Sequence, residues 1–216
     1  MSSVSVADVK LTGLLRRELV MSRDMLEDIL VVLRGIERGE TGEAGNVLGR
    51  IRERREDIEG LQLEFLAYLS RISRGITHRE DWMRIESKLY NVSDRLSGIS
   101  YRLGFLIEKR WRVPGEVLEQ LVEIGEKLGE MIQRFEVILA ESTERPEEAI
   151  GRIKEVRERE RVIDERFRSA LFTILDSNVS QSSMLLLLNI AEMLEENSDT
   201  LNEAANDLYI VLLDMV

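Results

Sequence analysis

The chain has 216 residues, of which 44% are hydrophobic and 33% charged, which is enough for one large domain or two small ones. It contains no cysteine, and this excludes disulfides and thiolate metal sites such as zinc fingers and iron–sulfur clusters. The formal net charge of −11 argues against nucleic acid and anionic lipid surfaces as partners, and it favours cations or basic proteins.

The chain reads as a succession of six long helices separated by short breaks. The helices are predicted at 6–38, 44–73, 78–110, 115–141, 146–176 and 181–215. Thr77 and Glu80 form a capping-box pattern at the start of the third helix. Pro114 and Pro146 lie where a first helical turn tolerates proline. Alternating apolar runs, which would predict strands, are absent from the sequence, so an all-α fold is expected.

No segment of the sequence predicts secretion or a membrane span. The first residues lack the basic region and the apolar stretch that a signal peptide combines, so none is expected. The longest apolar run is 184–188, whereas a spanning helix needs about 20 apolar residues.

An apolar seam at 3–4 spacing follows the third helix and recurs in the sixth. In the third helix it consists of Trp82, Ile85, Leu89, Val92, Leu96, Ile99, Leu103 and Leu106. A shift of 105 residues converts these positions into Leu187, Ile190, Leu194, Asn197, Leu201, Ala204, Leu208 and Val211. The same shift carries the apolar positions of the second helix onto the fifth, although a rival echo, GRIRE at 49 and GRIKE at 151, gives a shift of 102. We therefore expect two tandem three-helix bundles, at 1–110 and 111–216.

Residues suited to catalysis are scarce. His78 is the only histidine, and its place in the first turn of a helix predicts a solvent-exposed side chain. With no cysteine, one histidine and no glycine-rich phosphate loop, the chain has no recognisable nucleophile pair or nucleotide motif. We therefore expect a protein that is not an enzyme.

Two sets of carboxylates stand out from the other acidic residues. Glu160 occupies a seam position between Val156 and Ile163, and a buried charge there needs an ionic partner or a metal. Asp164 follows one turn later. On the sixth helix Glu195, Asp199 and Glu203 repeat every four residues along one face. Two helices that each present acids at this spacing can surround a cation with oxygen ligands. A buried salt bridge for Glu160 and a solvated stripe on the sixth helix are the alternatives.

Three passages resemble the PhoU-like family, in particular the branch of phosphate-transport-regulator related or Pit accessory proteins. They are ITHREDWMRIESKLYNVSDRL (76–96), IGRIKEVRERERVIDERF (150–167) and IAEMLEENSDTLNEAANDL (190–208). With the matching helix order, the resemblance covers essentially the whole chain. It implies a pair of three-helix bundles that bind metal clusters through surface E/D-x-x-x-D motifs. The residues that match these motifs are Glu160, Asp164, Glu195, Asp199 and Glu203.

The resemblance also implies a role and partners. The expected protein is a cytoplasmic, non-enzymatic regulator or accessory protein of inorganic phosphate transport, peripheral to the membrane and able to form a homo-oligomer. Its partner would be a membrane phosphate transporter, and its cation would be iron, zinc, calcium or magnesium. In the first half, Arg55, Tyr90 and Gly98 stand at the places of three of the acids, which puts a site there in doubt.

Two other functions remain open at this point. A helical scaffold or oligomerising adaptor without metal would explain the many Arg and Glu residues as structural or solvated groups. A di-metal carboxylate enzyme ranks last, because such bundles draw Glu-x-x-His ligands from their helices and this chain has no histidine in such a place.

Overall fold

The computed structural model describes residues 4–72 and 76–216, and in that part of the chain every regular element is a helix. The six helices are α1 (Val6–Arg38), α2 (Ala44–Arg71), α3 (Arg79–Glu108), α4 (Gly115–Glu141), α5 (Pro146–Asp176) and α6 (Gln181–Leu213). The predicted fold class is confirmed, and the predicted ends differ by at most two residues, at α2, α3 and α6. Residues 73–75 of the predicted break at 73–77 lie outside the described residues.

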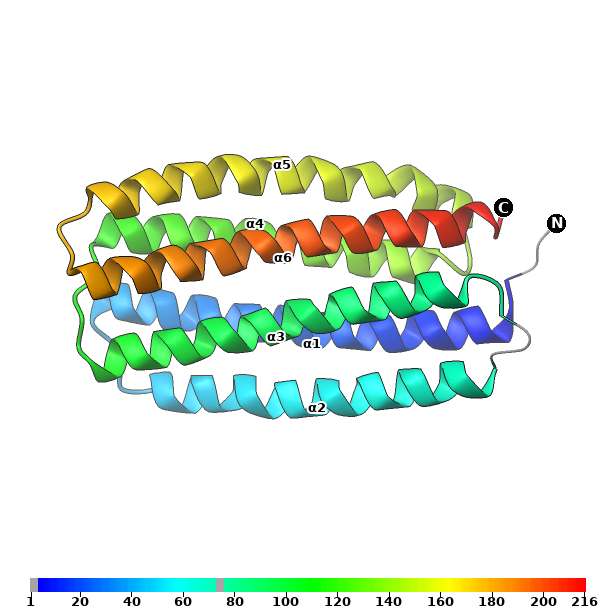
Figure 1. The fold of residues 1–216 in the computed structure, drawn as a ribbon, viewed down its shortest axis with the longest axis horizontal. Coiled ribbons are helices and arrows are strands. Elements are labelled where there is room, and N and C mark those ends of the chain that lie inside the picture. The colour runs from blue at the N-terminus through cyan, green and yellow to red at the C-terminus, as the bar shows by residue number, and fades with distance from the viewer. Residues whose placement is uncertain (1–3, 73–75) are drawn as a thin grey trace.

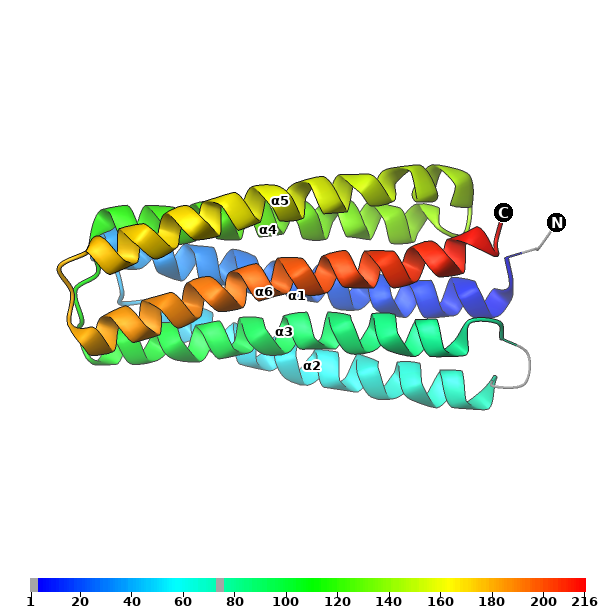
Figure 2. The same cartoon turned by 45° about the horizontal axis from the view of Figure 1, so that its top comes forward.

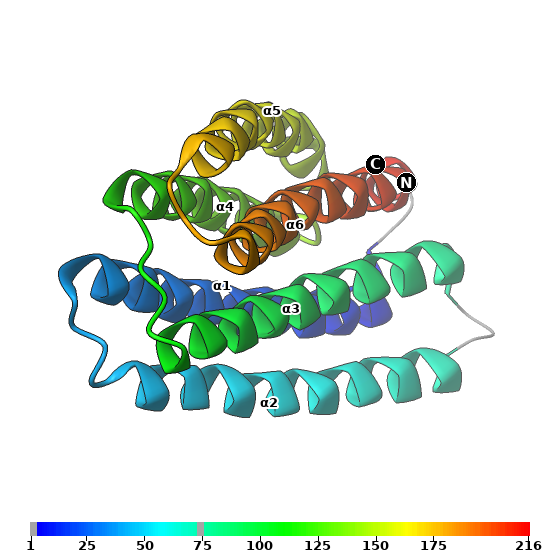
Figure 3. The same cartoon turned by 60° about the vertical axis from the view of Figure 1, so that its left-hand side comes forward.

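The helices run side by side as two bundles of three, and the first residues of α1 lie at the same end as the last residues of α6 (Figure 1). In the described residues, α2 packs only against α1 and α3, and α5 packs only against α4 and α6. The two bundles meet where α1 packs against α4 and where α3 packs against α6. Within the second bundle, α4 packs against α5. Figure 3 shows the resulting order, with α5 and α2 on opposite outer sides and the other four helices between them.

The apolar seam forms the core of both bundles. Leu89, Leu96 and Leu103 on α3 are at most 1% exposed, and so are Leu194, Leu201 and Leu208 on α6. The corresponding residues of α2 and α5, such as Ile51 and Val156, are completely buried as well. The 3–4 spacing therefore identified the buried face of each helix, because side chains three or four residues apart project from one side.

Local signals account for several helix ends. Ser5 and Asp8 form a capping box at the start of α1, with the Ser5 Oγ accepting from the Asp8 amide at 3.2 Å. Gly39 ends α1 with φ = 73°, a left-handed conformation that glycine adopts without a Cβ penalty. The capping box predicted at Thr77 and Glu80 is wrong. His78 is instead the N-cap of α3, with φ = 59°, and no side chain caps that end.

Small residues allow the two bundles to approach closely. A Cβ at Gly98 of α3 would lie 2.6 Å from the Met193 Cε on α6, and a Cβ at Gly125 of α4 would lie 2.7 Å from the Leu30 Cδ2 on α1. Both glycines therefore lie where their helices contact the other bundle. Figure 2 shows α3 running beside α6 at this interface. No helix in residues 4–72 and 76–216 is both long and apolar enough to cross a membrane.

Candidate metal centre

Three of the predicted site residues converge near the middle of α5 and α6. One carboxylate oxygen from each of Glu160, Asp164 and Asp199 lies within 4.8 Å of the other two. The four-residue spacing places Glu160 and Asp164 on one side of α5, and the packing of α5 on α6 brings Asp199 to them. Oxygen ligands lie about 2.3–2.6 Å from a calcium ion, so two of them are at most about 5 Å apart. The donor set therefore fits a hard cation.

The three carboxylates and the neighbouring Glu195 repel one another. Burial, followed by the negative charges of Asp199 and Asp164, raises the pKa of Glu195 from 4.5 to about 7. Burial and then Asp164 and Asp199 raise the pKa of Glu160. Burial and then Asp164 and Glu203 raise the pKa of Asp199, while Arg95 opposes this shift. A bound cation would relieve this repulsion.

Few basic groups neutralise the cluster. Asp164 accepts from Arg168, one turn along α5, at 2.8 Å. Glu160, Glu195 and Asp199 form no ion pair with any other residue that the structure describes. Glu160 is half-buried rather than buried, and the buried salt bridge considered for it is absent from the described residues. Glu160 and Glu195 are half-buried and Asp199 is exposed, and carboxylates without an ionic partner are a donor set that a cation can stabilise.

Glu195 and Glu203 lie differently from the three converging acids. Glu195 is half-buried, and it lies close enough to the cluster for the negative charges there to raise its pKa. It is not one of the three acids that converge. Glu203 is exposed and pairs with Lys88 of α3, with Nζ to Oε2 at 3.4 Å. The stripe on α6 is therefore divided among a half-buried acid, a converging acid and an acid that faces the other bundle.

The sequence reasoning missed a polar ladder between α3 and α6. Lys88 also pairs with Asp207 at 2.7 Å, and the Arg95 Nη1 donates to the Thr200 hydroxyl at 2.9 Å. Arg95 further pairs with Glu196 at 3.1 Å. Residue numbers rise on one helix as they fall on the other, so the two helices are antiparallel. The basic residues Lys88 and Arg95 beside the seam of α3 and the acids beside the seam of α6 could have indicated these pairs. The sequence did not show that α3 and α6 are neighbours.

His78 is not the solvent-exposed residue that was expected. Its Nδ1 lies 3.0 Å from Asp81 on α3, and its Nε2 lies 3.2 Å from Asp214 beyond the end of α6. Its side chain is 24% exposed. The imidazole therefore connects the first turn of α3 to the end of α6, a contact between distant parts of the chain that no local pattern could reveal.

A second feature missed from the sequence is a pair of buried acids in the first bundle. Glu18 of α1 and Glu86 of α3 are each 2% exposed, and one carboxylate oxygen of each has no hydrogen-bond partner in the part of the chain that the structure describes. Burial and then the charge of Glu86 raise the pKa of Glu18 well above its usual range. Glu18 stands next to the apolar Leu19 in the sequence, and Glu86 stands next to the apolar Ile85, which was a usable signal.

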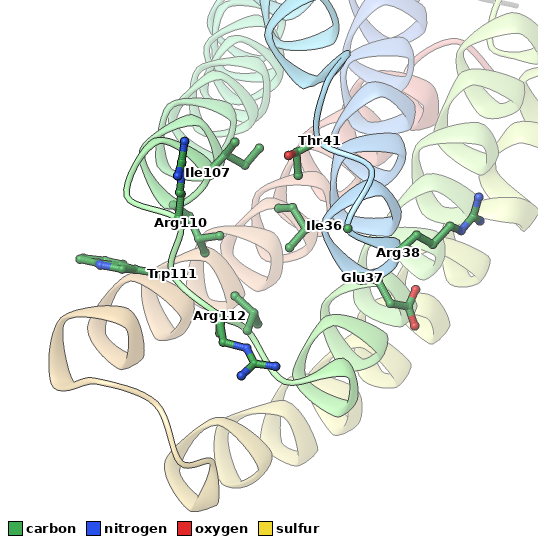
Figure 4. A pocket seen from close by; sticks show the side chains of 11 residues that line it. Ile36, Glu37, Arg38, Thr41, Ile107, Arg110, Trp111 and Arg112 are labelled. Atoms are coloured by element: carbon green, nitrogen blue, oxygen red, sulfur yellow. The ribbon is translucent and has the colours of Figure 1, made fainter.

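A separate pocket lies at one end of the bundle. It encloses about 490 Å³ between the end of α1 and the linker that follows α3. Arg110 and Arg112 of that linker line it, but their guanidinium groups point in different directions (Figure 4). Glu37 and Arg38 extend from the far side of α1 in the same view. These groups do not converge on a common ligand, so the carboxylate cluster remains the better candidate site.

Comparison with known proteins identifies the fold. Two crystal structures from Shewanella oneidensis, one assigned as a PhoU-like phosphate regulatory protein and the other as a PhoU-like protein, match with a TM-score of 0.77. They are 13% and 15% identical, and each alignment covers 94% of this chain and 99% of the other. PhoU from Pseudomonas aeruginosa matches with a TM-score of 0.72 and 16% identity over 97% of this chain and 95% of its own.

Comparison of the sequence with protein families and with curated proteins finds no relative. The chain thus has the fold of PhoU-like proteins, which confirms the resemblance drawn from the sequence at the level of the fold.

Proposed function

We propose that the chain is a non-enzymatic regulator or accessory protein of inorganic phosphate transport and that its second half holds a metal cation. The fold supports the first part, because the similar structures are assigned as PhoU or PhoU-like phosphate regulatory proteins. The convergence of Glu160, Asp164 and Asp199 within 4.8 Å of one another supports the second. This convergence is the observation that carries the proposed cation site.

The proposed site uses this chain's residues in distinct roles. Glu160, Asp164 and Asp199 supply oxygen ligands from two helices, and Glu195 supplies further negative charge beside them. Glu203, held by Lys88, lies at the margin. A bound cation would neutralise these acids and connect α5 to α6. Iron, zinc, calcium and magnesium all accept carboxylate oxygens, so the donor set admits each of them.

The proposal includes the organisation of the chain and its place in the cell. We take 1–110 and 111–216 as two repeats, since the 105-residue shift relates buried positions of α2 to buried positions of α5 and those of α3 to those of α6. The partner would be a membrane phosphate transporter contacted from the cytoplasm, without insertion of this chain into the bilayer. A homo-oligomer is compatible with this role, and nucleic acid is not a partner.

Co-purification with a phosphate permease tests this role. The permease is expected to co-purify with the wild-type protein. Deletion of the gene that encodes this protein is expected to change the uptake of phosphate. Restoring the gene with Asp199→Asn and Glu160→Gln together tests whether the cation site matters, with Asp94→Asn in the first half as the matched control. If no permease is retained and uptake is unchanged by deletion, a scaffold without a transport role replaces this proposal.

A further inference from the structure

Arg55 of α2 is held by two carboxylates, one from its own helix and one from α3. Its Nη1 lies 3.1 Å from Glu59 Oε1, and its Nη2 lies 3.1 Å from Asp94 Oδ1. The arginine side chain is 12% exposed, although both carboxylates are exposed. The guanidinium therefore lies inside the α2–α3 contact, with the two acids over its outer side.

Tyr90 of α3 holds the same guanidinium from another direction. The Nη2 of Arg55 donates a hydrogen bond to the Tyr90 hydroxyl, and the Arg55 Cζ lies 4.1 Å from the centre of the Tyr90 ring. An aromatic face attracts a cation through its quadrupole, and a planar guanidinium stacks on it well. Arg55 is thus fixed by two carboxylates, a hydroxyl and a ring, as a bound ion would be fixed by its ligands.

These four residues are the counterparts of the candidate metal centre under the 105-residue shift. The pairs are Arg55 with Glu160, Glu59 with Asp164, Tyr90 with Glu195, and Asp94 with Asp199. The surrounding apolar residues correspond too, since Ile51 and Ile58 are as completely buried in α2 as Val156 and Ile163 are in α5. The two places are therefore equivalent in the fold, and they differ in charge.

We propose that the Arg55 guanidinium is a built-in cation which closes a latent divalent-cation site in the first half, so that this half needs no metal. The comparison with the second half rests on the proposed function. In the second half three acids converge, and among the described residues only Asp164 pairs with an arginine, Arg168 on its own helix, whereas in the first half two acids share the central Arg55. A divalent ion beside a fixed guanidinium would be repelled, and that guanidinium already balances one of the two carboxylate charges of Glu59 and Asp94.

Arg55→Glu tests this inference, because it copies the second-half arrangement of Glu160, Asp164 and Asp199. The variant is expected to bind one more equivalent of divalent ion per chain than the wild type, measured by elemental analysis after dialysis against zinc, calcium or magnesium. Adding Asp94→Asn to Arg55→Glu should remove the extra equivalent. Arg55→Gln is the matched control, because it removes the cation without adding an acid.

The stoichiometry of folded Arg55→Glu decides the question, and an unchanged number of bound ions would overturn the inference. If Arg55→Glu does not fold, Arg55→Gln decides in its place. In chelator at low salt, Arg55→Gln is expected to melt several degrees below the wild type, because Glu59 and Asp94 lose their shared cation, whereas melting like the wild type would overturn the inference. A wild-type chain without bound metal would refute the proposed function but not this inference. The number of ions that Arg55→Glu gains is measured relative to the wild type, even when the wild type binds none.

Discussion

Lys88 of α3 lies 3.4 Å from Glu203 of α6, so a lysine from the first half pairs with the last acid of the stripe that was predicted to bind metal. The same ammonium pairs with Asp207 at 2.7 Å. This contact distinguishes Glu203 from Asp199, one turn before it, which has no ionic partner among the described residues. Asp199 and Glu203 belong to the same four-residue repeat, but only Glu203 forms an ion pair across the interface between α3 and α6.

Glu203→Gln should therefore leave metal uptake close to that of the wild type. It pairs with Lys88, and it is not one of the three converging acids. Glu160→Gln is the comparison and should lower the affinity for the ion at least tenfold, because it removes a ligand from the converging set. Titration calorimetry with a divalent ion measures both variants. An equal loss of affinity in both would contradict this account of the stripe.

The metal-free protein should lose stability as the pH rises from about 4.5 to about 7. The folded pKa of Glu195 is raised to about 7, so its protonated form is favoured by folding. Its stabilising contribution is complete below the unfolded pKa and is lost as the pH rises through the folded pKa. Denaturant unfolding in chelator at several pH values measures this effect.

Glu195→Gln is the control for that pH dependence. The variant has no proton to lose at this position, so at pH 7.5 it should be more stable than the metal-free wild type, with the difference shrinking toward pH 4.5. Added metal should narrow the difference at high pH by favouring the ionised carboxylate. A wild type and a variant with parallel pH profiles would show that Glu195 does not sense the cluster.

Glu18→Gln should stabilise the protein at neutral and alkaline pH. Burial raises the pKa of Glu18 well above its usual range, with Glu86 adding to the shift and Arg55 opposing it. The wild-type stability then falls with pH, by up to about 1.4 kcal/mol per unit, between the unfolded and the folded pKa, whereas the glutamine has nothing to titrate. Unfolding at pH 5 and pH 8 measures the change. A variant that is less stable than the wild type at pH 8 would contradict the expectation.

Leu194→Ala should lower the free energy of unfolding by about 2–5 kcal/mol, because the side chain is completely buried in the second bundle and its removal leaves a cavity. Leu185, which is 62% exposed at the start of α6, is the control, and Leu185→Ala should change the free energy by less than about 0.5 kcal/mol. Urea unfolding measures both. Equal losses would mean that the seam does not form the core.

The sequence was sufficient for the fold because helix periodicity is a local property. A 3–4 spacing identifies the buried face of each helix without any knowledge of its neighbours, and Leu89 and Leu194 both lie where it predicts. The spacing of Glu160 and Asp164 likewise predicts that both acids project from one side of α5.

The remaining features of the site depend on how two helices are placed against each other. The rotation of α5 and α6 about their axes decides which acid of α6 reaches α5. The four-residue repeat does not distinguish Glu195, Asp199 and Glu203 in this respect. The contacts of Lys88 with Glu203 and of His78 with Asp214 join residues more than a hundred positions apart. Sequence periodicity carries no information on such pairs, so the ladder and the histidine contact could not be predicted.

The metal content of three purified proteins shows whether the acids of α5 and α6 hold a cation. Elemental analysis should compare the wild type, the double variant Glu160→Gln with Asp199→Asn, and Asp94→Asn, all purified without a metal-chelating column. We expect metal in the wild type, its loss in the double variant and its retention in Asp94→Asn, because the first-half acid already pairs with Arg55. Loss of metal in Asp94→Asn with retention in the double variant, or a wild type that takes up no metal, would contradict it.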